Sequence, residues 1–115
     1  MKNLSPTIYR KRIVIELVPG VLVNTKKVDV YLKKLSKLLK MRLVRGPMTR
    51  KNPRYGISSY IYWEESGTHF YFWEKPFPFL SVDIYTCKKF VNKAAVDFTK
   101  KYFKAKKSEW KEVKI

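Results

Sequence analysis

Three consecutive runs rich in aromatic and β-branched residues constrain the fold of this chain more than any other feature. They cover Tyr55–Glu64, Thr68–Trp73 and Phe79–Thr86, and such side chains favour β-strands. Ser66-Gly67 separates the first two runs as a predicted turn, and Pro76-Phe77-Pro78 interrupts the chain before the third. Strands joined by short turns pair with one another in the antiparallel direction, so this region predicts an antiparallel meander.

Two amphipathic segments outside this region predict helices. The first begins at Asn24 or Thr25, either of which can cap a helix, and runs to about Lys40. The second is capped by Asn92 and runs to about Lys104. The lysines on the outer side of the first helix are interpreted as a solvated surface. The predicted inner faces consist of Val28, Leu32, Leu35, Leu38 and Leu39 in the first helix, and of Ala94, Ala95, Phe98 and Tyr102 in the second.

Three further strands complete the predicted order of elements. Ile8–Val18 shows strand-like alternation, Met41–Val44 is a short strand, and Trp110–Ile115 is a closing edge strand. A basic loop with Arg45, Arg50, Lys51 and Arg54 follows the short strand. The order β-α-β-β-β-β-α-β predicts an α+β fold, in which both helices pack on one face of an antiparallel sheet. The chain contains no linker or repeat, so residues 1–115 are expected to form one domain.

Composition narrows the class of protein. The 115 residues are 45% hydrophobic, which is enough for a packed core, and no apolar run is long enough to cross a membrane. The N-terminus lacks the apolar stretch of a signal peptide, and the single cysteine excludes an internal disulfide, so we expect a cytoplasmic protein. The net charge of +17 has two explanations, a lysine-rich solvated surface or a nucleic-acid partner. The absence of a nucleic-acid motif favours the first.

One segment departs from the basic character of the chain. Between Tyr55 and Cys87 the only basic residue is Lys75, whereas the acidic residues there are Glu64, Glu65, Glu74 and Asp83. A locally acidic segment suits a cationic ligand better than a phosphate, although chance clustering in a polar region remains the alternative.

Several segments resemble the prokaryotic-type S-adenosylmethionine decarboxylases. The run from Ser58 to Ser66 is similar to the family's strand that ends in a Glu-Ser cleavage site, and Val82-Asp83-Ile84-Tyr85-Thr86-Cys87 is similar to its Val-Asp-Val-Phe-Thr-Cys run. Trp73 stands where the family has a tryptophan between these motifs. The segment from Arg12 to Leu17 resembles the first strand of the family, and Asn92 stands at its second helix cap. The resemblance covers nearly the whole chain.

This resemblance implies a self-processing enzyme with a pyruvoyl cofactor, working in polyamine synthesis. The Ser66 hydroxyl would attack the Glu65 carbonyl, and elimination and hydrolysis would convert Ser66 into the pyruvoyl group. Cys87 would act as the general acid, and Ser58 would take part in processing. The resemblance also implies that Glu16, Trp73 and Glu74 contact a cationic, S-adenosylmethionine-like substrate, that the protein is a homodimer, and that no metal is needed.

The sequence departs from the family pattern around the predicted active site. Tyr71 stands where the family has a histidine, five residues after the cleavage serine, and the only histidine is His69. Side chains 69 and 71 lie on the same side of a strand, so His69 is a candidate replacement from about 7 Å along the strand. Lys75 stands where the family has a glutamate, and Gly67 follows the serine where the family has histidine.

These departures leave other functions open. An arginine-like substrate is possible within the enzyme hypothesis. A homologue that never processes and acts as a binding or regulatory protein is the first alternative, and a basic nucleic-acid-binding protein is the second. From the residues alone, Ser66-Gly67 is also compatible with a plain hairpin turn, Cys87 with a small buried side chain, and His69 with a structural role.

Overall fold

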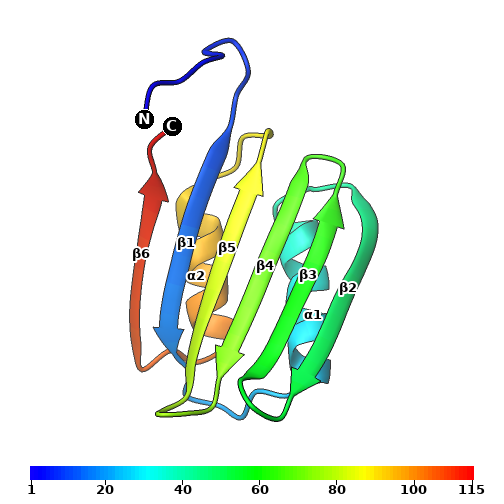
Figure 1. Cartoon of the computed structure of the whole chain (residues 1–115), viewed down its shortest axis with the longest axis vertical. Coiled ribbons are helices and arrows are strands. Elements are labelled where there is room, and N and C mark those ends of the chain that lie inside the picture. The colour runs from blue at the N-terminus through cyan, green and yellow to red at the C-terminus, as the bar shows by residue number, and fades with distance from the viewer.

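The alternation of apolar and polar residues in the strands produces a six-stranded antiparallel sheet with one covered face and one open face (Figure 1). The computed structural model describes all residues, 1–115. The sheet order is β2-β3-β4-β5-β1-β6. Its elements are β1 (Lys11–Val18), α1 (Thr25–Leu38), β2 (Leu43–Asn52), β3 (Gly56–Trp63), β4 (Ser66–Trp73), β5 (Phe79–Thr86), α2 (Asn92–Tyr102) and β6 (Lys107–Val113).

Both helices lie on the same side of the sheet, and the core fills the space between the two layers (Figure 1). Strand β1 contributes Ile13, Ile15 and Leu17 to this core, all at most 1% exposed. A hydrogen bond of 2.7 Å between the Tyr31 hydroxyl and Thr99 Oγ1 joins the helices within it. The structure therefore confirms the predicted α+β class, the antiparallel sheet and the placement of both helices on one face.

The helices are rotated slightly relative to the predicted inner faces. In α1, Tyr31 is fully buried while Leu38 is 44% exposed. In α2 the buried residues are Ala95, Val96 and Thr99, whereas Ala94, Phe98 and Tyr102 are only partly buried. Aromatic packing explains the rotation of α1, because the Tyr31 ring contacts Phe70 on the sheet and Phe103 after α2.

Three local predictions were wrong. The basic loop after Val44 is part of strand β2, which tolerates Pro47 because it is an edge strand with register shifts between Leu43, Arg45 and Met48. The residue that caps α2 is Val91 and not Asn92, because Asn92 is already the first residue of the helix. The Asn92 side chain instead donates from Nδ2 to Glu112 Oε1 on β6.

The predicted turn between β3 and β4 is also displaced by two residues. Glu64 and Glu65 make the turn, and Ser66 and Gly67 already belong to β4. Strand boundaries shift elsewhere as well, since β1 begins at Lys11 and β6 begins at Lys107. The turn shift matters most, because it places the predicted cleavage bond at the point where the hairpin enters β4.

Candidate active site

The predicted cleavage residues and the predicted acid lie together at one end of the sheet. Strand β4 begins at Ser66, which pairs with Thr86 at the end of β5. The backbone N–H of Cys87, one residue further, donates to the carbonyl oxygen of Glu65 at 2.9 Å. We call Glu65, Ser66 and Cys87 the cleavage cluster. The carbonyl that the Ser66 hydroxyl would attack therefore already accepts a hydrogen bond from the residue proposed as the acid.

The Ser66 backbone has an unusual conformation. Its φ angle is +131°, a region that residues with a Cβ rarely adopt. Such conformations cost about 1–3 kcal/mol each and persist only where the surrounding structure imposes them. The peptide bond between Glu65 and Ser66 is thus held next to a strained residue, a feature common at functional sites.

Gly67 serves a packing role next to this residue. A Cβ atom at Gly67 would lie 2.4 Å from the Ile61 carbonyl oxygen and 2.8 Å from the Tyr60 hydroxyl. The glycine therefore allows the Tyr60 ring to lie close to β4. The Tyr60 hydroxyl donates to the Ser66 carbonyl oxygen at 3.4 Å. Sequence reasoning missed Tyr60, and only the cross-strand register could have identified it.

The Glu65 side chain is buried and fixes the hairpin turn. It is 6% exposed, and its carboxylate accepts from the Arg42 backbone N–H at 3.0 Å and from Arg42 Nε at 3.3 Å. The backbone hydrogen bond from Arg42 is the main reason that the pKa of Glu65 is lowered, while burial opposes it. Glu65 is therefore an anchored carboxylate at neutral pH.

The locally acidic segment is largely neutralised by arginines from elsewhere in the chain. Arg42 also lies 3.2 Å from Glu64 Oε2, and Arg12 makes two hydrogen bonds to Asp83, at 3.0 and 2.8 Å. Only Glu74, among the four carboxylates, has no ion pair. The segment therefore offers a cationic ligand much less negative charge than its composition indicated.

Two other predicted site residues, Glu16 and Ser58, lie in one row across the open face of the sheet. The strand register places Glu16, Ser81, Tyr71 and Ser58 side by side on β1, β5, β4 and β3. We call these four residues the serine row. Tyr71 and Ser58 also line a hollow of about 240 Å³ together with Trp73. Five residues separate Tyr71 from Ser66 along β4, so this row lies about 16 Å from the cleavage cluster within one chain.

His69 lies on the open face between these two groups. Its register partners are Tyr60 and Asp83, and its ring lies 4.4 Å from that of Tyr60. The His69 and Tyr71 rings stack at 6.1 Å with an interplanar angle of 9°, which confirms that they share a face. His69 is three residues from Ser66, or about 10 Å along the strand.

Trp73 and Glu74 lie at the far end of β4 from the cleavage bond. Trp73 is the last residue of the strand, about 23 Å from Ser66 along it, and Glu74 is exposed in the following loop. Within one chain, then, the fold joins Ser66 with Cys87 but does not bring Ser58, Trp73 or Glu74 to them.

No group of three or more histidine, cysteine, aspartate or glutamate side chains is arranged to hold a metal ion. Neither helix has the length and apolar character needed to cross a membrane.

Comparison with known proteins agrees with this architecture. A crystal structure of the adenosylmethionine decarboxylase from Aquifex aeolicus VF5 matches with a TM-score of 0.71, covering 92% of this chain and 89% of that chain. The sequence identity is 17%, so this likeness shows the fold alone. No curated protein matches the sequence. The sequence model of the S-adenosylmethionine decarboxylase family matches residues 13–114. The match spans most of the chain, which therefore belongs to the S-adenosylmethionine decarboxylase family.

Proposed function

We propose that this protein is a self-processing, pyruvoyl-dependent decarboxylase that acts on S-adenosylmethionine, or on a related amino acid such as arginine, in cytoplasmic polyamine synthesis. The observation that carries the proposal is the 2.9 Å hydrogen bond from the Cys87 N–H to the Glu65 carbonyl oxygen. A donor aimed at that oxygen would stabilise the negative charge that develops when a hydroxyl attacks the carbonyl carbon.

The proposed processing begins with an N-to-O acyl shift. Ser66 Oγ attacks the Glu65 carbonyl carbon, an ester bond forms, and the peptide C–N bond breaks. Removal of the Ser66 α-proton then breaks the ester bond and frees the main-chain carboxylate of Glu65, which ends the first chain. Hydrolysis by water then releases ammonia and leaves a pyruvoyl group at the start of the second chain. The positive φ of Ser66 favours the first step, because breaking the peptide bond relieves the strain.

The residues of the cleavage cluster fit such a group. When present at residue 66, a pyruvoyl group supplies a ketone that withdraws electrons from the carbon losing carbon dioxide. Cys87 follows the strand end that pairs with Ser66, and its side chain is exposed. A thiol in this position can deliver a proton to the product carbon. The side-chain carboxylate of Glu65 accepts hydrogen bonds from Arg42, and these would hold the new chain end in place after cleavage.

We further propose that the site is completed by a second copy of the chain. Tyr62, Tyr71 and Tyr85 are 39–44% exposed on the open face, and an aromatic sheet face of this kind favours a partner. A copy packed on that face and turned end for end would bring its serine row toward the cleavage cluster of the first chain. The 16 Å separation within one chain then becomes a contact between chains.

Light scattering tests the dimer. Tyr71→Glu places a charge in the proposed interface and should give a monomer of 13.8 kDa, whereas Lys101→Glu on the helix layer should not change the assembly. A monomeric parent protein would refute the dimer but leave the cleavage chemistry to be tested separately.

Intact mass spectrometry tests processing. Cleavage between Glu65 and Ser66 would give chains of 65 and 50 residues that together make up the 115-residue protein, the second blocked by pyruvoyl. Ser66→Ala should remain intact because it has no hydroxyl. If the parent protein stays uncut after prolonged heating at neutral pH, the enzyme proposal fails and a binding or regulatory role becomes the better account. The substitution of Tyr71 for the family's histidine is the observation that favours this second function.

A further inference from the structure

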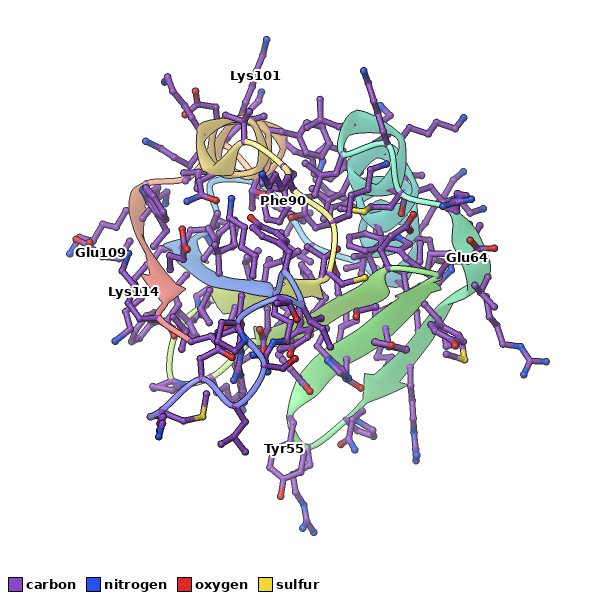
Figure 2. The ribbon with its side chains drawn as sticks, turned by 90° about the horizontal axis from the view of Figure 1, so that it is seen from above. Tyr55, Glu64, Phe90, Lys101, Glu109 and Lys114 are labelled. Atoms are coloured by element: carbon purple, nitrogen blue, oxygen red, sulfur yellow. The ribbon has the colours of Figure 1, made fainter.

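The outer surface of the helix layer is strongly basic. It is made of nine exposed lysines at the outward positions of the two helices and just beyond their ends, and we call it the lysine layer. Figure 2 looks from above and shows Lys101 extending from α2 away from the sheet. The members of the lysine layer are Lys26, Lys33, Lys34, Lys37, Lys40, Lys93, Lys100, Lys101 and Lys104.

Almost no negative charge balances these lysines. Residues 25–40 contain six lysines and one aspartate, and residues 92–104 contain four lysines and one aspartate. Asp97 pairs with Lys93 at 2.7 Å, and Asp29 accepts a hydrogen bond from Thr49 on β2. No other lysine of the layer forms an ion pair. Eight ammonium groups therefore repel one another on one surface, which an anionic partner would relieve.

The packing of the helices concentrates this charge further. The Tyr102 hydroxyl near the end of α2 donates to the Lys27 carbonyl oxygen at 2.7 Å, and the Lys27 ammonium lies 4.5 Å from the Tyr102 ring. The start of α1 thus lies against the end of α2, where Lys100 and Lys101 are found. From Lys26 to Lys37 the charged row of α1 spans about 16 Å. Duplex DNA presents about one phosphate charge per 1.7 Å of its axis. A duplex lying along the lysine row of α1 would therefore place several phosphates near these lysines.

We propose that the lysine layer binds the phosphate backbone of double-stranded nucleic acid. Single strands are usually held by aromatic side chains that stack on bases, and no aromatic residue of α1 or α2 is among the exposed hydrophobic residues. Membrane-surface helices insert apolar side chains, whereas Leu38 is the only large apolar residue exposed within either helix. Rows of lysine without such residues match backbone binding without base recognition.

This site is independent of the proposed decarboxylase. The helices cover one face of the sheet (Figure 1). The alternation of buried and exposed residues in the strands places the serine row on the other face. Packing of a second copy on the open face would leave both lysine layers exposed. Nucleic-acid binding can therefore fail without affecting processing, and processing can fail without affecting binding.

Fluorescence anisotropy with a labelled 20-base-pair DNA duplex, in potassium chloride from 50 to 200 mM, tests the proposal. We expect the logarithm of the association constant to fall against the logarithm of salt concentration with a slope of about −4 or steeper, at roughly −0.9 per phosphate neutralised. The variant Lys33→Gln/Lys37→Gln/Lys100→Gln/Lys104→Gln should lose about 3 to 4 from the magnitude of that slope and bind at least tenfold more weakly at 100 mM salt. Lys33, Lys37 and Lys100 lie within helices, where glutamine has a propensity close to that of lysine, and Lys104 is an exposed residue after α2, so the fold should be retained.

The matched control removes the same charge from elsewhere on the molecule. The variant Lys2→Gln/Arg54→Gln/Lys75→Gln/Lys114→Gln changes four exposed residues outside the helix layer, and it should keep the parent slope within about 1. Equal losses in the two variants would overturn the proposal in favour of diffuse charge attraction. Tighter binding to single-stranded DNA, or to vesicles containing 30% phosphatidylserine, would also overturn it. If the quadruple helix variant unfolds, the two double variants, one per helix, are compared instead.

Discussion

Replacement of Ser66 by glycine should stabilise the protein relative to replacement by alanine. Both variants lack the hydroxyl and stay uncut, so they report only on the backbone. Ser66 has a φ of +131°, and an alanine there keeps the steric conflict because it has a Cβ. Glycine adopts positive φ without that conflict, so the strain disappears in this variant alone.

The expected difference follows from two opposing terms. The strain relieved is about 1–3 kcal/mol, and the added conformational entropy of the unfolded chain costs about 0.4–1 kcal/mol. The net gain for Ser66→Gly over Ser66→Ala is therefore about 1 kcal/mol, or about 4 °C in Tm for a domain of this size. Urea titration and differential scanning calorimetry measure the two quantities.

An ordinary strand position provides the control. Ser81 lies within β5 at intermediate burial and has no positive φ. There, Ser81→Gly should be less stable than Ser81→Ala by about 0.5–1 kcal/mol. If Ser66→Gly is likewise less stable than Ser66→Ala, the cleavage residue stores no strain and the argument from its backbone fails.

Three further predictions concern the same site. Cys87→Ala should keep the fold and the self-cleavage yet lose most decarboxylation, and unchanged turnover measured by carbon dioxide release would remove Cys87 from the mechanism. His69→Ala should slow cleavage by about 10²-fold or more if the His69 imidazole takes the α-proton of Ser66, and Tyr71→His should speed cleavage. Gel densitometry over time measures both rates. A His69→Ala variant that is cleaved at the parent rate would show that His69 is structural. The lowered pKa of Glu65 means that its carboxylate stabilises the fold above the unfolded pKa near 4.5 and loses this effect as the pH falls through the folded pKa. In a Ser66→Ala background, Glu65→Gln should therefore destabilise the protein by about 1–2 kcal/mol at pH 7 and by much less at pH 3 in urea titrations, and a constant difference across this range would contradict the assignment.

The alternating strands and the amphipathic helices could be predicted from the sequence because their patterns record burial directly. The buried, helix-facing side of β1, which consists of Ile13, Ile15 and Leu17, is an example. Strand β2 could not, because Gly46-Pro47 has the composition of a break. Only an edge position with register shifts accommodates that proline, and edge position is a property of the whole sheet.

Tertiary contacts also overrode the local signals at Gly67 and Asn92. Ser66-Gly67 has the composition of a turn, but the glycine is needed where the Ile61 carbonyl and the Tyr60 ring approach β4. Asn92 is a good capping residue, but its side chain bonds to Glu112 of β6 instead. Both partners come from other strands, so no local pattern could indicate them.

The candidate site could likewise be predicted from the sequence only in part. The residues proposed for cleavage could be identified only through the family motifs, and the contact between Cys87 and the Glu65 carbonyl depends on the register of β4 with β5. The separation of Tyr71 from Ser66 follows from their spacing on one strand, whereas the position of Ser58 beside Tyr71 depends on the register of β3 with β4. A resemblance between motifs assigns residues to one site without saying whether one chain or two must supply them.

The structure also indicates which step of the proposed cleavage depends most on the residues that differ from the family pattern. The groups proposed to act on the Glu65–Ser66 bond lie together, since the Glu65 carbonyl accepts a hydrogen bond and Ser66 has a positive φ. The departure from the family pattern concerns the proposed base, because Tyr71 stands at the family's histidine position. A phenol with an ordinary pKa near 10 is a weak base at neutral pH, whereas an imidazole titrates close to it. If Tyr71 must act, cleavage should therefore be slow, and Tyr71→His should speed it. If His69 of either copy reaches Ser66, His69→Ala should instead slow cleavage by about 10²-fold or more. The rates of these two variants thus separate the two bases.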